Sequence, residues 1–329
     1  MSDRVEEEKP VLSLRGLTTV FKTDLGAVKA VDNLDLDLPT GATLGIVGES
    51  GCGKSTVGLS IMKLIPEPPG RIASGEIVFE GKDLTKLSNR QMRSIRGNKI
   101  SIIFQEPMTS LNPVLRIGEI LSEVIRTHQQ VSRKQAWEKS IDALDKVRIP
   151  SPHIRINDYP HEMSGGMRQR VMIALAICCD PSLIIADEPT TALDVTIQAQ
   201  ILSLLGGIKQ ALGTSIILIT HNLGVIAENT EKVAVMYAGR LVEYADTAAL
   251  FDTPLHPYTQ GLLRATPRPD EVIERMIAIE GAPPNLISPP PGCAFASRCE
   301  RAGESCGLSP ALTAYEENRM VSCWCASKK

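Results

Sequence analysis

Residues Gly48–Thr56 constrain the possible folds of this chain more than any other segment. They read Gly-Glu-Ser-Gly-Cys-Gly-Lys-Ser-Thr, so three glycines precede a Lys-Ser pair. The apolar run Ala42–Val47 comes before them and predicts a buried strand, and Thr56–Ile65 continues with helical character. A strand, a glycine-rich turn and a helix in this order indicate an α/β fold with the turn at the carboxyl end of a sheet strand.

The chemistry of this turn suits a phosphate group. Glycines allow successive backbone N–H groups to point toward one anion, and the following helix adds the positive end of its dipole. The pattern G-x-x-x-x-G-K-S is that of a phosphate-binding P-loop, and the flanking strand and helix disfavour a chance glycine-rich turn. We expect Lys54 to reach the β- and γ-phosphates of ATP and Ser55 to place its hydroxyl on Mg²⁺. The predicted nucleotide contacts are Gly48, Glu49, Ser50, Gly51, Cys52, Gly53, Lys54, Ser55 and Thr56.

Strands and helices alternate along most of the chain, which predicts a mostly parallel sheet with helices on its faces. Residues 107–180 have mostly helical periodicity and are expected to form a helical insertion in that fold. The composition changes near residue 250, where a proline-rich connector begins and leads into a cysteine-rich tail. We therefore predict one domain over residues 1–250 and an extension over residues 251–329.

Charge and hydropathy narrow the class of protein. The net charge of −3 and the pI near 6.0 give no bulk attraction to nucleic acid, so we expect no nucleic-acid partner. The longest fully apolar run, Val171–Cys179, is far shorter than the roughly 20 residues that a membrane-spanning helix needs. The N-terminus has no apolar stretch behind a basic start, so no signal peptide is expected and the cytosol is the expected compartment.

Two carboxylates follow the apolar run Leu183–Ala186, which predicts another core strand. Asp187 and Glu188 would then lie at the carboxyl end of that strand, where ligands bind in open α/β sheets. Asp187 suits Mg²⁺, and Glu188 suits a general base that polarises the water attacking the γ-phosphate. The alternative is that these two residues are an ordinary acidic strand end on the surface. The presence of a P-loop in the same chain disfavours this alternative.

Three further pieces follow in sequence order. Gln105 comes after the strand predicted at Ile100–Phe104, Ser164-Gly165-Gly166 opens a helix, and His221 ends the strand predicted at Ser215–Thr220. Each has an ordinary alternative: a polar strand end, a plain helix cap, or a core histidine. Together with the P-loop, their order over about residues 11–250 resembles the ATP-binding cassette (ABC) family.

This resemblance implies a role for each piece. Glu188, His221 and Gln105 would be catalytic, with Gln105 touching Mg²⁺ and the water, and His221 holding the γ-phosphate as the switch histidine. Ser164, Gly165 and Gly166 resemble the signature, which contacts ATP held by a partner subunit. The remaining implied contacts are Asp194 in Thr191-Ala-Leu-Asp194, at the dimer interface, and Phe21, which would stack on adenine unless it is a buried strand aromatic. The residue after the two signature glycines is Met167 in this chain, whereas the family more commonly has Gln at this position.

Physical reasoning also favours a dimer. One P-loop surrounds only part of a triphosphate, and the helix N-terminus at Ser164 offers N–H groups and a positive dipole end to more of it. The helical insertion would hold that helix away from the nucleotide of its own subunit. Two chains arranged head-to-tail would each complete the other's site, and ATP hydrolysis would release them.

Two stretches resemble the dipeptide, oligopeptide and nickel importers within this family: Phe104–Val114 and Thr253–Thr259. This branch implies a motor subunit at the cytoplasmic face of the inner membrane. The implied partners are a homologous second ATPase subunit in a heterodimer, two transmembrane permease subunits and an extracytoplasmic substrate-binding protein. Peptides are the leading substrate, with nickel chelates or glycosides as alternatives. A soluble ABC ATPase acting on ribosomes or DNA is less favoured, because the chain has one cassette and no sustained heptads.

Five of the eight cysteines fall within residues 293–325. In a reducing compartment such a cluster favours a metal site over a disulfide framework. Four thiolates spaced along a loop fit a [4Fe–4S] cluster or a Zn²⁺ site. The third interpretation is that the thiols bind no metal. The pattern resembles the C-terminal cysteines of the same importers, which favours the cluster and leaves Cys325 as a spare. The ligands implied are Cys293, Cys299, Cys306 and Cys323.

Overall fold

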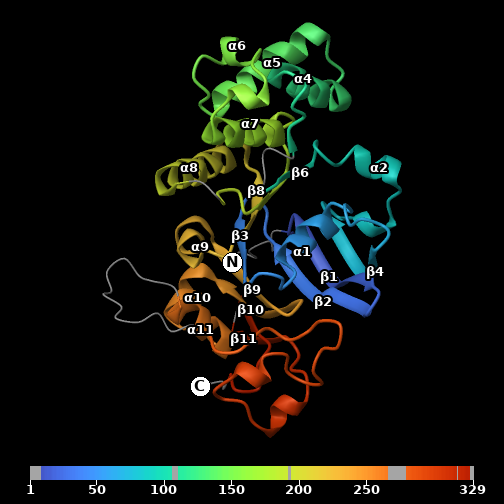
Figure 1. Ribbon diagram of the computed structural model, residues 1–329, viewed down its shortest axis with the longest axis vertical. Helices are drawn as coiled ribbons and strands as arrows, with labels where there is room; N and C mark the ends of the chain where they lie inside the picture. Colours follow the sequence, from blue (N-terminus) through green and yellow to red (C-terminus); the bar gives the residue numbers. More distant parts are fainter. Residues whose placement is uncertain (1–8, 106–109, 192–193, 266–278, 317, 327–329) are drawn as a thin grey trace, which may run out of the picture. The chain divides into compact units, whose positions relative to one another are not determined.

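The computed structural model describes residues 9–105, 110–191, 194–265, 279–316 and 318–326. The chain divides into two compact units, one made by residues 1–85 and 218–329 and the other by residues 86–217 (Figure 1). The short 3-10 helix η1 (Leu84–Lys86) and strand β8 (Ser215–Ile219) span the two points of division. Each unit is described separately below.

The first unit contains an antiparallel sheet with the strand order β2-β1-β4-β5. Its core face is apolar because Leu12, Leu14 and Leu17 of β1 are all buried. This separate antiparallel sheet differs from the mostly parallel sheet that the sequence predicts. The strands are β1 (Leu12–Thr23), β2 (Gly26–Leu38), β4 (Gly70–Phe79) and β5 (Lys82–Asp83).

A second sheet in this unit runs in the order β11-β12-β10-β9-β3. Strands β3 (Thr43–Val47) and β9 (Lys232–Tyr237) pair in parallel, and their residues are almost entirely buried, as expected for a strand covered on both faces. The antiparallel continuation consists of β10 (Arg240–Asp246), β12 (Arg319–Val321) and β11 (Thr313–Glu316). The helices of the unit are α1 (Lys54–Ile61), α9 (Leu223–Asn229), α10 (Thr247–Asp252), α11 (Pro257–Arg264), η3 (Ala296–Arg298) and η4 (Glu304–Gly307).

The C-terminal extension is joined to this second sheet. Glu243 and Tyr244 of β10 pair with Val321 and Met320 of β12, so the tail adds strands to the sheet that contains β3. Helix α11 forms within the segment that the sequence indicated to be a proline-rich connector. The extension therefore lies in the same compact unit as the strand that leads into Gly48–Thr56.

The second unit contains the predicted helical region. Helices α4, α5, α6 and α7 contact one another (Figure 1), and the hydroxyls of Ser122 and Ser140 are hydrogen-bonded at 3.1 Å in the buried α4–α5 interface. Strands β6 (Ile100–Ile103) and β7 (Leu183–Asp187) pair in parallel, as predicted for two core strands. The helices are α2 (Asn89–Arg93), α4 (Ile117–His128), α5 (Arg133–Lys146), α6 (Pro152–Arg155), η2 (Pro160–Glu162), α7 (Gly165–Ile177) and α8 (Val195–Leu212).

Within the described residues, no helix combines the length and apolar character required to cross a bilayer.

Candidate nucleotide-binding site

Residues Gly48–Thr56 connect β3 to α1. At two positions of this loop, Gly48 and Gly53, the backbone leaves no room for a side chain. Gly48 has a φ of 148° and Gly53 a φ of 103°, in the region that L side chains rarely adopt. A Cβ at Gly48 would lie 2.2 Å from the carbonyl oxygen of Met236, and one at Gly53 would lie 2.1 Å from that of Ala30. The loop backbone is therefore pressed against β9 and β2, and α1 begins directly at Lys54.

Lys54 is 6% exposed, and its Nζ donates hydrogen bonds to the carbonyl oxygens of Gly48 and Glu49, at 2.8 and 3.0 Å. The ammonium is thus held over the loop, as a lysine that contacts phosphate oxygens must be. Cys52 is also buried, and burial raises the pKa of its thiol. Ser55 is exposed in the first turn of α1.

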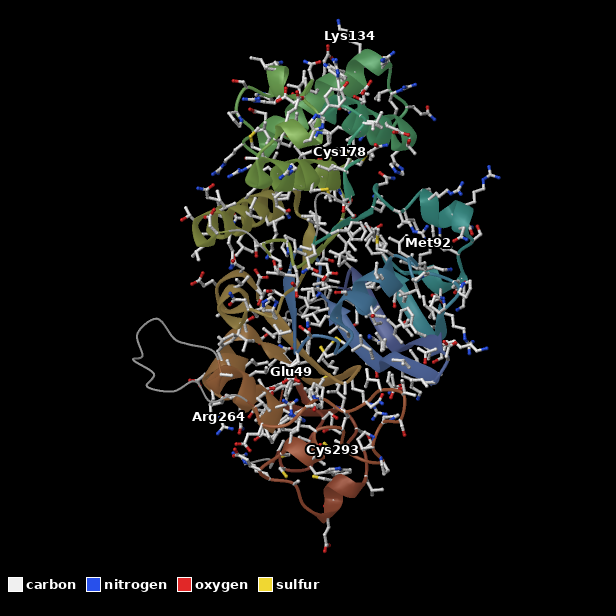
Figure 2. All side chains as sticks on the ribbon, in the orientation of Figure 1. Glu49, Met92, Lys134, Cys178, Arg264 and Cys293 are labelled. Atoms are coloured by element: carbon white, nitrogen blue, oxygen red, sulfur yellow. The ribbon has the colours of Figure 1, made fainter. Side chains whose placement is uncertain are left out.

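Glu49 connects the loop to the C-terminal extension. Its backbone N–H donates to the hydroxyl of Tyr258 at 2.9 Å, and its carboxylate forms two hydrogen bonds with Arg298, at 2.8 and 2.9 Å. Figure 2 shows Glu49 beside the extension that carries Cys293. The contacts of Tyr258 and Arg298 with Glu49 were not predicted, although each residue lies in a stretch that the sequence singles out. No sequence signal links either residue to Glu49, which is 249 positions from Arg298.

His221 and Phe21 lie in the same unit as the loop. The N–H of Thr220 donates to the carbonyl oxygen of Ile46 at 3.3 Å, so the end of β8 lies next to the strand that enters the loop, and the exposed His221 follows immediately. Phe21 of β1 is half-buried with its ring against Gly70, where a Cβ would lie 2.7 Å from Cε1 of the ring. Part of the ring surface is therefore open for stacking.

In the second unit, the structure brings Gln105 and Glu188 together. They follow the parallel strands β6 and β7, and the Gln105 side-chain amide donates to the Glu188 carboxylate at 3.1 Å. The hydroxyl of Thr191 donates to the same carboxylate oxygen at 2.8 Å, a contact that the sequence analysis did not assign. Glu188 has a φ of 47°, and a non-glycine residue held in this left-handed region is typical of a functional site. Asp187 is the last residue of β7.

Ser164 and Asp194 begin helices of this second unit. The Ser164 hydroxyl accepts a hydrogen bond from the N–H of Met167 at 3.3 Å, which caps α7, and Gly165 and Gly166 form its first turn. Asp194 caps α8 by accepting from the N–H of Ile197 at 2.9 Å. Both capping residues are exposed. Capping is the ordinary role that their residue types favour, and it also directs the N-termini of α7 and α8 to the surface.

The predicted site residues are thus distributed over the two units. The P-loop, Phe21, His221 and the four tail cysteines belong to the first unit, and the predicted residues from Gln105 to Asp194 belong to the second. Of the motifs quoted from the sequence, residues 106–109 and 192–193 lie outside the part of the chain that the structure describes.

The cysteines of the extension do not form a ready metal site. Among the described residues, no three His, Cys, Asp or Glu side chains are grouped so as to hold a metal ion. The structure therefore gives no support to the predicted cluster, and all four thiols are free in this conformation.

The P-loop fold and the acidic strand end define the class: a P-loop ATPase of the ABC type. The family model described as "ABC transporter" matches residues 31–191, and that described as "Oligopeptide/dipeptide transporter, C-terminal region" matches residues 242–306. The chain belongs to the ABC transporter family, whose members bind ATP and Mg²⁺.

Individual relatives match almost the whole chain. The oligopeptide transport ATP-binding protein OppD of Haemophilus influenzae is 48% identical over 97% of this chain and 98% of its own length. The dipeptide transport ATP-binding protein DppD of Bacillus subtilis is 49% identical over 95% of this chain and 94% of its own length. A solved dimeric structure of the ATP-binding cassette MJ0796, bound to ADP and Pi after hydrolysis, superposes with a TM-score of 0.65 at 26% identity and covers 72% of this chain and 98% of that one.

Proposed function

We propose that this chain is the ATP-hydrolysing motor subunit of a membrane importer for dipeptides or oligopeptides. The observation that carries the proposal is the match of almost the entire chain, including the extension, to ATP-binding proteins named for peptide transport. Relatives named for peptides favour this substrate class over nickel chelates or glycosides, and a match that includes the extension favours an importer over a soluble ABC ATPase.

The side chains supply separate parts of the hydrolysis reaction. Lys54 neutralises charge on the β- and γ-phosphates, while the loop N–H groups and the start of α1 bind their oxygens. Glu188 accepts a proton from the attacking water, because its carboxylate is already oriented by Gln105 and Thr191. Ser55, Gln105 and Asp187 would hold Mg²⁺, and His221 would bind the γ-phosphate.

The proposed assembly is based on the N-termini of α7 and α8, where Ser164 and Asp194 are exposed and accessible to a second subunit. The solved dimeric cassette structures support an arrangement in which two cassettes face each other. We infer a heterodimer with a homologous ATPase subunit beneath two permease subunits, served by an extracytoplasmic substrate-binding protein. The chain would then be peripheral, at the cytoplasmic face of the inner membrane.

A [4Fe–4S] cluster on Cys293, Cys299, Cys306 and Cys323, with Zn²⁺ as the alternative, is a separate proposal that rests on the cysteine pattern alone. Metal binding would require these thiols to move closer together and to lose their protons. Iron and acid-labile sulfide in anaerobically purified protein, lost in Cys299→Ser, would support the cluster. Zinc without iron, or no bound metal, would overturn it.

Binding of ATP to the purified full-length chain tests the central part of this proposal. Lys54→Ala should abolish binding of a fluorescent ATP analogue, because it removes the cation over the loop. Arg264→Ala removes a half-exposed cation elsewhere in the same unit and should leave binding unchanged. Equal affinity of the wild-type and Lys54→Ala proteins would refute the assignment of the loop.

A further inference from the structure

The side chain of Arg298 is an unusually buried cation for a residue in an irregular tail. It is 4% exposed, whereas the Glu49 carboxylate that it faces is 25% exposed. Both carboxylate oxygens of Glu49 receive a hydrogen bond from the guanidinium, which is the two-point geometry that distinguishes arginine from lysine. The guanidinium also donates to the carbonyl oxygens of Ile279 and Glu280, at 3.2 and 2.9 Å, so its position is fixed from two sides.

An aromatic cluster supports this ion pair. The ring of Phe295 in the extension packs against Tyr237, Tyr258 and His256, with ring centroids 5.2, 5.4 and 5.8 Å apart. Tyr237 also lies under the Arg298 guanidinium at 5.8 Å, and the Tyr258 hydroxyl accepts the backbone N–H of Glu49. The extension thus contacts both the side chain and the backbone of one P-loop residue.

The negative charge of Glu49 affects how the loop binds a nucleotide. Glu49 is the second residue of a loop that binds a polyanion, so a free carboxylate there would repel the phosphates at short range. The same carboxylate would also attract the Lys54 ammonium, which lies beside the Glu49 carbonyl at 3.0 Å. A bidentate arginine neutralises the carboxylate and holds it in a fixed pair, at a site where solvent screening is reduced.

We propose that Arg298 is a positioning residue for the P-loop, and that the C-terminal extension is therefore a working part of the ATP site. This inference rests on the proposed function of Gly48–Thr56 as the ATP-binding loop. Arg298 acts through Glu49: it neutralises the carboxylate beside the nucleotide and, with Tyr258, fixes the loop. Any event that displaces residues 293–299 from the loop would lower ATP affinity.

The test measures the dissociation constant of a non-hydrolysable ATP analogue with Mg²⁺ on the full-length chain. Arg298→Ala should weaken binding about tenfold, because it leaves a partly buried carboxylate unpaired beside the phosphates. The double variant Arg298→Ala/Glu49→Gln should recover most of that loss, since the amide carries no charge. Arg298→Lys should give an intermediate loss, because an ammonium cannot make the two-point contact.

A purely structural role of Arg298 makes a different prediction. Loss of packing would be the same with glutamate or glutamine at position 49, so the double variant would bind as weakly as Arg298→Ala. That result, or an Arg298→Ala affinity equal to wild type, would overturn the proposal. If Arg298→Ala does not fold by circular dichroism, Arg298→Gln and Arg298→Gln/Glu49→Gln provide the same comparison with a longer uncharged side chain.

Two controls separate this inference from its premise. Arg319→Ala breaks another buried contact of the extension, with Glu243 at 3.5 Å, and should lower thermal stability with little effect on ATP affinity. An equal loss of affinity in Arg319→Ala would assign the effect to general docking of the tail and overturn the role of Arg298. Lys54→Ala tests the premise alone: retained ATP binding there would refute the loop assignment, whatever the Arg298 variants do.

Discussion

The carboxylate of Glu188 is oriented from two sides by residues of its own unit. The Gln105 amide and the Thr191 hydroxyl both donate to the same oxygen of the carboxylate, which fixes the side chain. The backbone of Glu188 is held at a positive φ, a conformation that costs free energy and persists where the surrounding structure enforces it. These contacts fit a general base that is held in position.

Replacement of Glu188 by glutamine should separate ATP binding from hydrolysis. Glutamine keeps the shape and hydrogen-bonding capacity of the side chain but cannot accept a proton, so we expect kcat to fall by at least about 100-fold. Affinity for ATP should stay close to wild type, because the P-loop is unchanged. Steady-state phosphate release and equilibrium binding measure the two quantities.

A carboxylate on α5 provides the matched control. Glu138→Gln changes the same chemical group at a side chain that is 61% exposed, and it should leave kcat and affinity unchanged. Full hydrolysis by Glu188→Gln would contradict the assignment of the base.

His256 shows how an apparent connector becomes part of the core. It is 2% exposed, and its Nδ1 accepts the N–H of Tyr258 at 3.0 Å, which caps α11. Its backbone N–H donates to the carboxylate of Glu243, and its ring packs against Phe295. Burial lowers the pKa of the His256 imidazole to about 4, against a smaller opposing effect of the Ser322 carbonyl.

This shift predicts a loss of stability in mild acid. In the unfolded chain His256 titrates near 6.5, so between about pH 4 and 6.5 the unfolded state binds more protons than the folded state. The stabilisation is complete above pH 6.5 and is lost as the pH falls, by about 2 kcal/mol at pH 5. His256→Asn keeps an acceptor at the cap without a titrating group, so its free energy of unfolding should fall less between pH 7 and 5. Urea unfolding at both pH values measures the difference.

The exposed His153 of α6 supplies the control for this experiment. His153→Asn removes a histidine from the surface and should retain the pH dependence of the wild type. If His256→Asn also retained it, burial of His256 would not be the cause of the acid sensitivity.

Elements with strong local signals could be predicted from the sequence, and elements formed by long-range pairing could not. The bounds of strands β3, β6, β7 and β8 lie within one residue of the ranges predicted for them, because an apolar run is a local signal. Helix α11 was missed because its prolines read as linker, although Pro257 occupies the first turn, where proline is tolerated. Strand β12 depends on pairing with β10, about 75 residues earlier, and has no periodicity of its own.

The same distinction applies to the site. The P-loop could be recognised because its function requires a fixed local spacing, and Glu188 because it directly follows a buried strand. Arg298 could not, since its partner Glu49 is 249 positions away and only the folded chain brings the two together. Thr191 could not because its role depends on a hydrogen bond to the Glu188 side chain, which no sequence pattern specifies.

At the scale of the whole assembly, the exposed N-terminus of α7 should serve the nucleotide of the other subunit. Ser164→Arg would place a bulky cation where the partner's γ-phosphate is expected, while the P-loop of this chain is untouched. We therefore expect normal ATP binding by the isolated chain and reduced ATP hydrolysis by the assembled transporter. Unchanged activity of the assembled transporter would contradict the head-to-tail dimer.

The central claim is that ATP hydrolysis by this chain drives peptide import. The most direct test reconstitutes the chain with its permease and ATPase partners in lipid vesicles and measures phosphate release with and without peptide-loaded binding protein. We predict that the loaded binding protein stimulates hydrolysis and that Glu188→Gln abolishes the stimulated rate. Hydrolysis that does not respond to peptide, or that survives in Glu188→Gln, would contradict the account.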